Sequence, residues 1–229
     1  MHPTGTGPEV VFLNTSGGMT GGDRLAYALT LGAGCRVTAT TQTAERAYRS
    51  VDGHATVEVT HDLGPGAHLD WLPQETILFD HSNLQRQTTV TLARGASCLL
   101  LEAVVLGRAA MGETLRALDL HDRRKVMREG VPILVEPLRM ADAALTAGPG
   151  VLNGARAFAS LALVQDGVEA RLAAVRASLD EPGVSAGASA FDGKLTVRLM
   201  AADGWPLRRQ ILRVLKVLRD SPLPRVWQM

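Results

Sequence analysis

The sequence contains little cysteine. Among its 229 residues only Cys35 and Cys98 are cysteines, and no CxxC pair or cysteine–histidine cluster occurs. A small secreted domain held by disulfides would carry more cysteines, and a structural zinc site would need more ligands at close spacing. Both cysteines lie in strand-like patterns that are typical of buried thiols. The cysteine content therefore argues against a disulfide framework and against structural zinc.

Aromatic residues and net charge are also scarce. Aromatic residues make up 4% of the chain, which argues against a carbohydrate or peptide binder built on an exposed aromatic ledge. The formal net charge is +1, from 24 basic and 23 acidic residues. A broad electrostatic surface for nucleic acid or an anionic membrane is therefore not expected. We predict no nucleic-acid partner.

Long apolar runs are absent as well. The N-terminal residues MHPTGTGPEV lack the basic and apolar regions of a signal peptide. The longest apolar region, residues 98–106, is interrupted by Glu102 and is too short to span a bilayer. We predict a cytoplasmic protein with no membrane partner.

Apolar residues nevertheless make up 46% of the chain, which is enough for a folded core. Residues 25–31 place leucines at alternate positions, the period of a half-buried strand. The same alternation recurs at residues 57–60, 89–92 and 194–199. We predict one domain over residues 1–229, strand-rich over about 1–150 and mixed strand and helix over about 151–229.

A degenerate repeat runs through the strand-rich part. The copies LGAGC, LGPGA and LARGA begin at Leu31, Leu63 and Leu92. The last glycine of each copy suits a turn position with positive φ, where a Cβ would cost about 1–2 kcal/mol. Repeats of this length bury their faces by stacking. We therefore predict a mainly β fold of stacked, coiled sheets that resembles a distorted β-helix or solenoid, the alternative being three unrelated hairpins.

Helical patterns are confined to the last third. Apolar residues recur at intervals of three and four over residues 168–179. Pro206 suits the first turn of a second helix that runs to about Asp220. We predict a few helices, including one near the C-terminus.

The most distinctive segment is NTSGGMTGGDRL, residues 14–25. Glycine pairs can cradle a phosphate with bare amides, which would make the protein a phosphate- or nucleotide-binding enzyme. However, no lysine follows the glycines as in a P-loop, and a strand pattern follows where that site needs a helix. We favour a structural corner in which Asp23 accepts amide hydrogen bonds and Arg24 pairs with a carboxylate. The glycines concerned are Gly17, Gly18, Gly21 and Gly22.

Three glutamates, Glu75, Glu102 and Glu113, lie in or beside apolar strands. Buried carboxylates are costly unless they are paired, so one interpretation is ion pairs with arginines such as Arg108. The other interpretation is a polar interior path for a hard or borderline cation. Near Glu113, we expect Met111 to serve packing and not metal binding.

Three histidines, His54, His61 and His68, follow one another at intervals of seven residues. A helix would bring them to one face, but the surrounding pattern is strand-like and Gly64-Pro65-Gly66 breaks any helix. We therefore expect solvated or hydrogen-bonded histidines and not a metal site. No Gly-x-Ser-x-Gly nucleophile motif is present.

Five segments in this order resemble the UreD/UreH family of urease accessory proteins. They are residues 14–25, TQTAERAYRS at 41–50, LPQETILF at 72–79, LGRAAMGE at 106–113 and LPRVW at 223–227. The resemblance covers nearly the whole chain. Family members usually carry a further segment before the glycine loop, and often lysine at the position of Arg46.

The resemblance implies a protein without catalytic residues that helps to install nickel in urease. Its partners would be UreF, UreG through the UreF complex, and the apo-urease subunits. No cofactor would be held permanently, because nickel would be transient cargo, and the three glutamates would be candidates to line its path. Arg225 and Trp227 would form a docking element with the C-terminal helix or, alternatively, Trp227 would pack into the core. The motif residues offered as structural or interface positions are Gly17, Gly18, Gly21, Gly22, Asp23, Arg24, Arg108, Glu113, Arg225 and Trp227.

Overall fold

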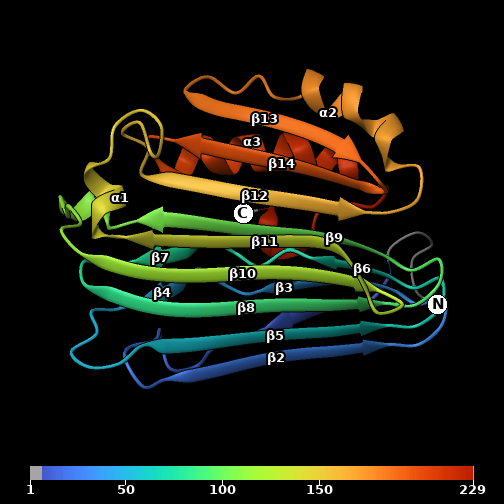
Figure 1. Ribbon diagram of the computed structural model, residues 1–229, viewed down its shortest axis with the longest axis horizontal. Coiled ribbons are helices and arrows are strands. Elements are labelled where there is room, and N and C mark those ends of the chain that lie inside the picture. The colour runs from blue at the N-terminus through green and yellow to red at the C-terminus, as the bar shows by residue number, and fades with distance from the viewer. Residues whose placement is uncertain (1–6, 229) are drawn as a thin grey trace.

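Three successive coils of parallel strands organise the first half of the chain. The computed structural model describes residues 7–228. Each coil places one strand in a five-stranded sheet and the next strand in a nine-stranded sheet, and the two sheets face each other (Figure 1). The coils are Arg24–Leu31 (β2) with Arg36–Thr41 (β3), Ala55–Leu63 (β5) with His68–Trp71 (β6), and Ser82–Leu92 (β8) with Ser97–Leu106 (β9).

The glycine repeat forms the turns between the paired strands of these coils. Gly34, Gly66 and Gly95 have φ values of 69°, 66° and 68°. The turns stack, because the Gly34 amide donates to the Pro65 carbonyl at 2.8 Å and the Gly66 amide donates to the Arg94 carbonyl at 3.0 Å. The predicted solenoid-like stacking is therefore confirmed, and the alternative of unrelated hairpins is wrong.

The remaining elements extend both sheets. The five-stranded sheet has the order β11-β10-β8-β5-β2, and the long path of the nine-stranded sheet is β1-β3-β6-β9-β12-β14-β13. The added strands are Glu9–Phe12 (β1), Glu45–Ala47 (β4), Thr76–Leu78 (β7), Leu118–Arg128 (β10), Val131–Ala141 (β11), Ala157–Val164 (β12), Val184–Phe191 (β13) and Lys194–Ala201 (β14). The α-helices are Asp142–Thr146 (α1), Leu172–Ala177 (α2) and Gly204–Leu218 (α3), with 3₁₀ turns at Ala109–Met111, Val168–Arg171 and Arg225–Trp227.

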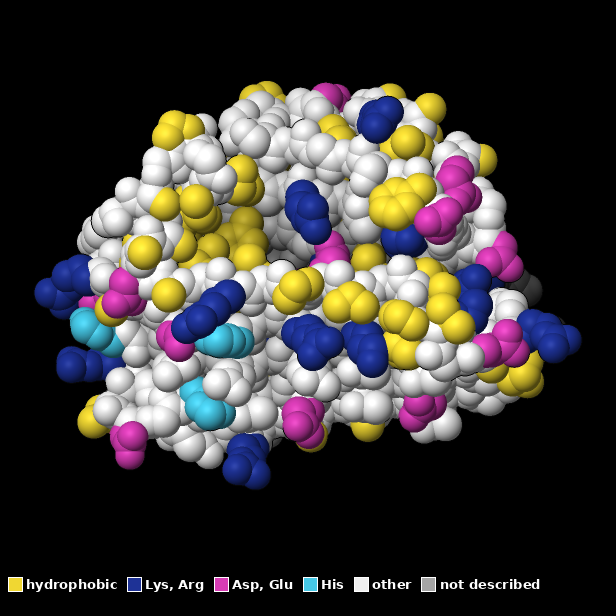
Figure 2. Space-filling view, in the orientation of Figure 1, with side chains coloured by type: hydrophobic (Ala, Val, Ile, Leu, Met, Phe, Trp, Pro, Cys, Tyr) yellow, Lys and Arg dark blue, Asp and Glu magenta, His cyan; other side chains and the backbone are white. Residues whose placement is uncertain are grey.

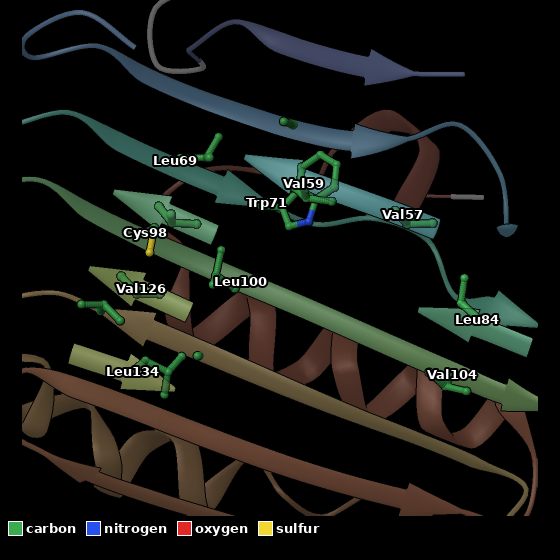
Figure 3. Packing of buried hydrophobic residues seen from close by; sticks show 14 of the residues in the cluster. Val57, Val59, Leu69, Trp71, Leu84, Cys98, Leu100, Val104, Val126 and Leu134 are labelled. Carbon is green, nitrogen blue, oxygen red and sulfur yellow. The ribbon is translucent and has the colours of Figure 1, made fainter. Parts of the chain in front are cut away.

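Two apolar cores hold this arrangement together. The first lies between the sheets, where Trp71, Leu84 and Leu100 are almost fully buried (Figure 3). The second lies between the nine-stranded sheet and α3, which packs Leu207 and Ile211 against β12 and β14. Side chains of β9 and β12 point alternately into the first and the second core. Because both faces of these strands are covered, their sequences are nearly continuous apolar runs.

The predicted C-terminal helix is confirmed as α3. Asp203 caps it by accepting the Trp205 amide at 2.8 Å, and Pro206 lies in the first turn as expected. The helix predicted over residues 168–179 is shorter, with a 3₁₀ turn at Val168–Arg171 followed by α2. No helix within residues 7–228 is long and apolar enough to cross a membrane.

Only one of the two cysteines is a buried thiol. Cys98 lies in the core, and burial raises its pKa to about 12. Cys35 is exposed because it follows the turn glycine Gly34, before β3 begins. The prediction of burial is therefore wrong for Cys35.

A cleft opens where the nine-stranded sheet extends beyond the five-stranded one. One wall is formed by β10 and β11 and the other by β12, β14 and β13. The cleft has a volume of about 620 Å³. Figure 2 shows this hollow between the two halves of the molecule, with apolar and charged side chains inside it. The five-stranded sheet ends at β11, whereas the nine-stranded sheet continues through β12 and β14 to β13.

Candidate functional site

Four of the five motif segments meet at one end of the coils, opposite the glycine turns. We call this surface the loop end and define it by residues 14–23, 45–50, 78–81 and 107–113. Backbone hydrogen bonds join its loops in order: the Met19 amide donates to the Arg46 carbonyl at 2.7 Å, and the Phe79 amide donates to the Ala47 carbonyl at 3.0 Å. The Gly107 amide then donates to the Leu78 carbonyl at 2.8 Å. Stacking of the coils therefore brings distant motifs together.

Glycine is required where the first loop approaches its neighbours. A Cβ on Gly18 would overlap the Tyr48 ring and lie 2.8 Å from the Arg46 carbonyl oxygen, at a φ of +152°. A Cβ on Gly21 would overlap the carbonyl oxygen of Asp52. The Gly17 carbonyl accepts hydrogen bonds from the Arg46 guanidinium at 3.2 Å and the Tyr48 hydroxyl at 3.0 Å.

Several amides of this loop donate to groups within the protein. Asp23 accepts the Thr20 amide at 2.8 Å, as predicted, and the Gly22 amide donates to the His54 carbonyl at 3.0 Å. The strand β2 follows directly, so this loop does not lead into a helix N-terminus. Arg24 is exposed and forms no ion pair within residues 7–228, so its predicted pairing is wrong. This geometry favours the structural corner over an anion cradle.

The fourth loop is fixed by an ion pair between Arg108 and Glu113. The Arg108 Nε donates to Glu113 Oε2 at 2.9 Å, and the guanidinium lies 4.4 Å from the centre of the Phe79 ring. The hydrogen bond from Arg108 lowers the pKa of Glu113, and amide donors from Arg108 and Asp80 act in the same direction. The predicted pairing is confirmed. Met111 is 73% exposed, so the packing role expected for it is wrong.

The C-terminal motif lies apart from the loop end. Trp227 is 2% exposed, its Nε1 donates to the Leu72 carbonyl at 3.0 Å, and the Arg208 guanidinium lies 4.5 Å from its ring centre. The interpretation of Trp227 as a packing residue is confirmed. Arg225 is exposed, and its amide donates to Glu9 at 3.2 Å.

The three glutamates considered for a cation path are dispersed. Glu75 is only partly buried and lies 3.7 Å from Arg208 on the side of α3. Glu102 is 6% exposed and lines the cleft, whereas neither Glu75 nor Glu113 lies among the residues that line it. Within the described part of the chain, no group of three or more His, Cys, Asp or Glu side chains has metal-binding geometry.

The ion-pair interpretation is confirmed for Glu102, although its arginine partner was not predicted from the sequence. Arg86 on β8 lies between two carboxylates, 2.7 Å from Glu102 on β9 and 2.6 Å from Asp122 on β10. Burial raises the pKa of Glu102, and the Arg86 guanidinium acts in the opposite direction. All three side chains are at most 8% exposed.

A second set of ion pairs crosses the cleft. Arg124 on β10 donates to Ser160 on β12 and pairs with Glu136 on β11. Glu136 also pairs at 2.9 Å with Arg198 on β14, which is 74% exposed at the mouth. We call the two sets together the buried ion network, which consists of Arg86, Glu102 and Asp122 and of Arg124, Glu136 and Arg198.

Comparison with known proteins places the chain in a family. The family model described as "UreD urease accessory protein" matches residues 1–228. The chain belongs to the UreD family. It is 63% identical over 223 residues to the urease accessory protein UreD of Cereibacter sphaeroides strain ATCC 17025, covering 96% of this chain and 81% of the relative.

More distant relatives carry the same name. The chain is 55% identical over 223 residues to the urease accessory protein UreD of Paracoccus denitrificans, covering 96% of this chain and 80% of that protein. It is 46% identical over 224 residues to the protein of that name from Rhizobium leguminosarum bv. trifolii, covering 96% and 81%. The resemblance found in the five motifs is therefore confirmed, and a role in urease maturation is supported.

One signal in the sequence of this UreD family member could have revealed the buried ion network. Arg86, Asp122 and Arg124 occupy the same alternate positions as the buried leucines and valines of β8 and β10. A charged residue at an inward position of a strand is expected to find an opposite charge inside the protein. Sequence spacing does not reveal which strands face each other, so the ion-pair partners of these residues could not be predicted.

The three histidines do not converge. His54 is exposed, and His68 contacts Ser97 at 2.7 Å and Asp70 at 3.0 Å, as expected for solvated and hydrogen-bonded side chains. His61 differs, since it is fully buried against Trp71 and neither ring nitrogen has a hydrogen-bond partner within residues 7–228. The expectation is wrong for His61 alone.

Proposed function

We propose that this UreD family member is a cytoplasmic scaffold without catalytic activity that binds apo-urease together with UreF and UreG. Nickel would pass through the assembly as cargo and enter the urease active site. The family membership supports the maturation role. The loop end supports a structural role for the glycine motif, because the amides of Met19, Thr20 and Gly22 donate to groups within the protein.

The observation that carries the nickel step is the set of carboxylates at the floor of the cleft. Glu102 and Asp122 reach the cleft from opposite sheets, with Glu136 on the wall nearer the mouth. Carboxylate oxygens bind hard and borderline dications, and each of these carboxylates already has an arginine partner. Arginine counter-charges prevent tight retention of a dication, which suits transient passage and not storage.

The first experiment tests assembly. The protein is co-expressed with apo-urease and with UreF and UreG, and each partner is sought in the purified complex. Association at micromolar concentrations is expected. A protein that binds neither urease nor UreF at these concentrations would contradict the proposed scaffold.

The second experiment tests the path with a matched pair of variants. Glu102→Gln removes a cleft carboxylate that pairs with Arg86, and Glu75→Gln removes a carboxylate that pairs with Arg208 outside the cleft. We expect Glu102→Gln to lower the nickel content of co-expressed urease while the complex still forms, and Glu75→Gln to leave it unchanged. Equal nickel content with both variants would rule out the path through the cleft.

A further inference from the structure

Three cations lie close together on the outer face of the five-stranded sheet. Arg123 and Lys125 are on β10 and Arg139 is on β11, all at positions whose side chains point away from the core. None of the three forms an ion pair with a residue in the range 7–228, although their neighbours Asp119 and His121 pair with each other at 3.2 Å.

Apolar residues lie directly beside these cations. Val135 is opposite Lys125 and Pro137 is opposite Arg123 in the antiparallel register, so each pair shares the outer face. Val135 is 45% exposed. We call the surface formed by Arg123, Lys125, Val135, Pro137 and Arg139 the basic strip. Figure 2 shows basic and apolar side chains side by side across the middle of this face.

The positive charge of the basic strip is not neutralised by the adjacent strand. The partners of Arg123 and Lys125 on β8 are Gln87 and Thr89, which carry no charge. The next carboxylate in register is Glu58 on β5, two strands from Arg123. Two strand spacings amount to about 10 Å, which is a full Debye length at moderate salt.

The strand β11 is also the edge of its sheet, yet it is poorly suited to pairing with another strand. It contains Pro132 and Pro137, which have no N–H to donate to an added strand. A second copy of the chain or an extended peptide would therefore gain few hydrogen bonds there. The outer face of β11, in contrast, presents charged and aliphatic side chains to which a partner can bind.

We propose that the basic strip docks an acidic protein surface on one of the assembly partners, with carboxylates placed around an aliphatic row. This inference rests on the proposed scaffold function and assigns the chemistry of one contact in it. The carboxylates pair with Arg123, Lys125 and Arg139, and the aliphatic row covers Val135 and Pro137. Charge complementarity of this kind accelerates association and makes it sensitive to salt.

A double charge reversal tests the basic strip against a matched control. Arg123→Glu/Lys125→Glu reverses two charges on the strip, and Arg36→Glu/Arg94→Glu reverses two exposed arginines at the glycine-turn end. Binding to apo-urease and to UreF is measured at about 50 mM and about 300 mM salt. We expect the strip variant to bind one partner about tenfold more weakly at low salt, with a smaller salt dependence, and the control to bind as the wild type does.

Melting temperature and circular dichroism show whether each variant folds. Arg123→Gln/Lys125→Gln is the second variant, because it removes the charge without adding repulsion and should weaken binding less than the reversal. If the wild type binds neither apo-urease nor UreF, the proposed scaffold function is wrong. If the wild type binds and the strip variants bind as tightly as the control, the scaffold function stands and the proposed role of the basic strip is wrong. Tight binding of the wild type to duplex DNA, lost in the strip variants, would also overturn a protein partner for this surface.

Discussion

The burial of His61 leads to a quantitative prediction of how the stability of the protein changes with pH. Its side chain is completely buried on β5, its ring lies 4.9 Å from that of Trp71, and both ring nitrogens lack a hydrogen-bond partner within the described residues. Desolvation by burial lowers the pKa of His61 from 6.5 to about 4. The folded protein therefore holds His61 neutral at a pH where the unfolded chain would protonate it.

The sign of the effect follows from proton binding. Between pH 6.5 and about 4 the unfolded state binds more protons at this residue than the folded state, so lowering the pH favours unfolding. The part of the stability that depends on neutral His61 is fully present above pH 6.5 and is lost as the pH falls toward 4. At 1.36 kcal/mol per pH unit the full loss is about 3 kcal/mol, of which about 2 kcal/mol has occurred by pH 5. A typical domain has only about 5–15 kcal/mol in total.

Urea unfolding between pH 7.5 and 5 measures this loss. We expect the wild type to lose about 2 kcal/mol over this range and His61→Leu to lack that component. At pH 7.5 the variant should be at least as stable as the wild type, because leucine leaves no buried nitrogen without a partner. His54→Leu is the matched control, since His54 is exposed and should leave the slope unchanged. The same slope in His61→Leu and the wild type would refute the reasoning.

The other predictions concern the motif residues. Gly18→Ala forces a Cβ into the Tyr48 ring and should lower the free energy of unfolding by more than about 2 kcal/mol, measured by urea unfolding. Gly22 has open space around it but a φ of +89°, so Gly22→Ala should lower the free energy of unfolding by only about 1–2 kcal/mol. Normal stability of Gly18→Ala would show that the loop relaxes freely. Trp227→Ala should cost about 3–5 kcal/mol by thermal unfolding, because it removes a buried ring and the donor to Leu72, and a loss below about 1 kcal/mol would contradict the packing role.

Local features were predictable where the sequence carries a short period. The alternation of residues 25–31 predicted β2, and the glycine repeat predicted stacked turns, because each depends on a few adjacent residues. The helix α3 was predictable from its apolar stripe and Pro206. One error arose at the boundary of an element, at Cys35, whose exposure depends on where the turn ends.

The sequence by itself determined the family, from five motifs in order, and the coiled β fold, from the alternation of strands and the glycine repeat. Only the tertiary structure decided which charges meet, because Arg86, Glu102 and Asp122 come from three strands in two facing sheets. It also decided that Glu75 and Glu113 lie outside the cleft and that the cations of the basic strip share one face. Pairing between distant strands depends on register and on the packing of the sheets, and neither is encoded in local spacing.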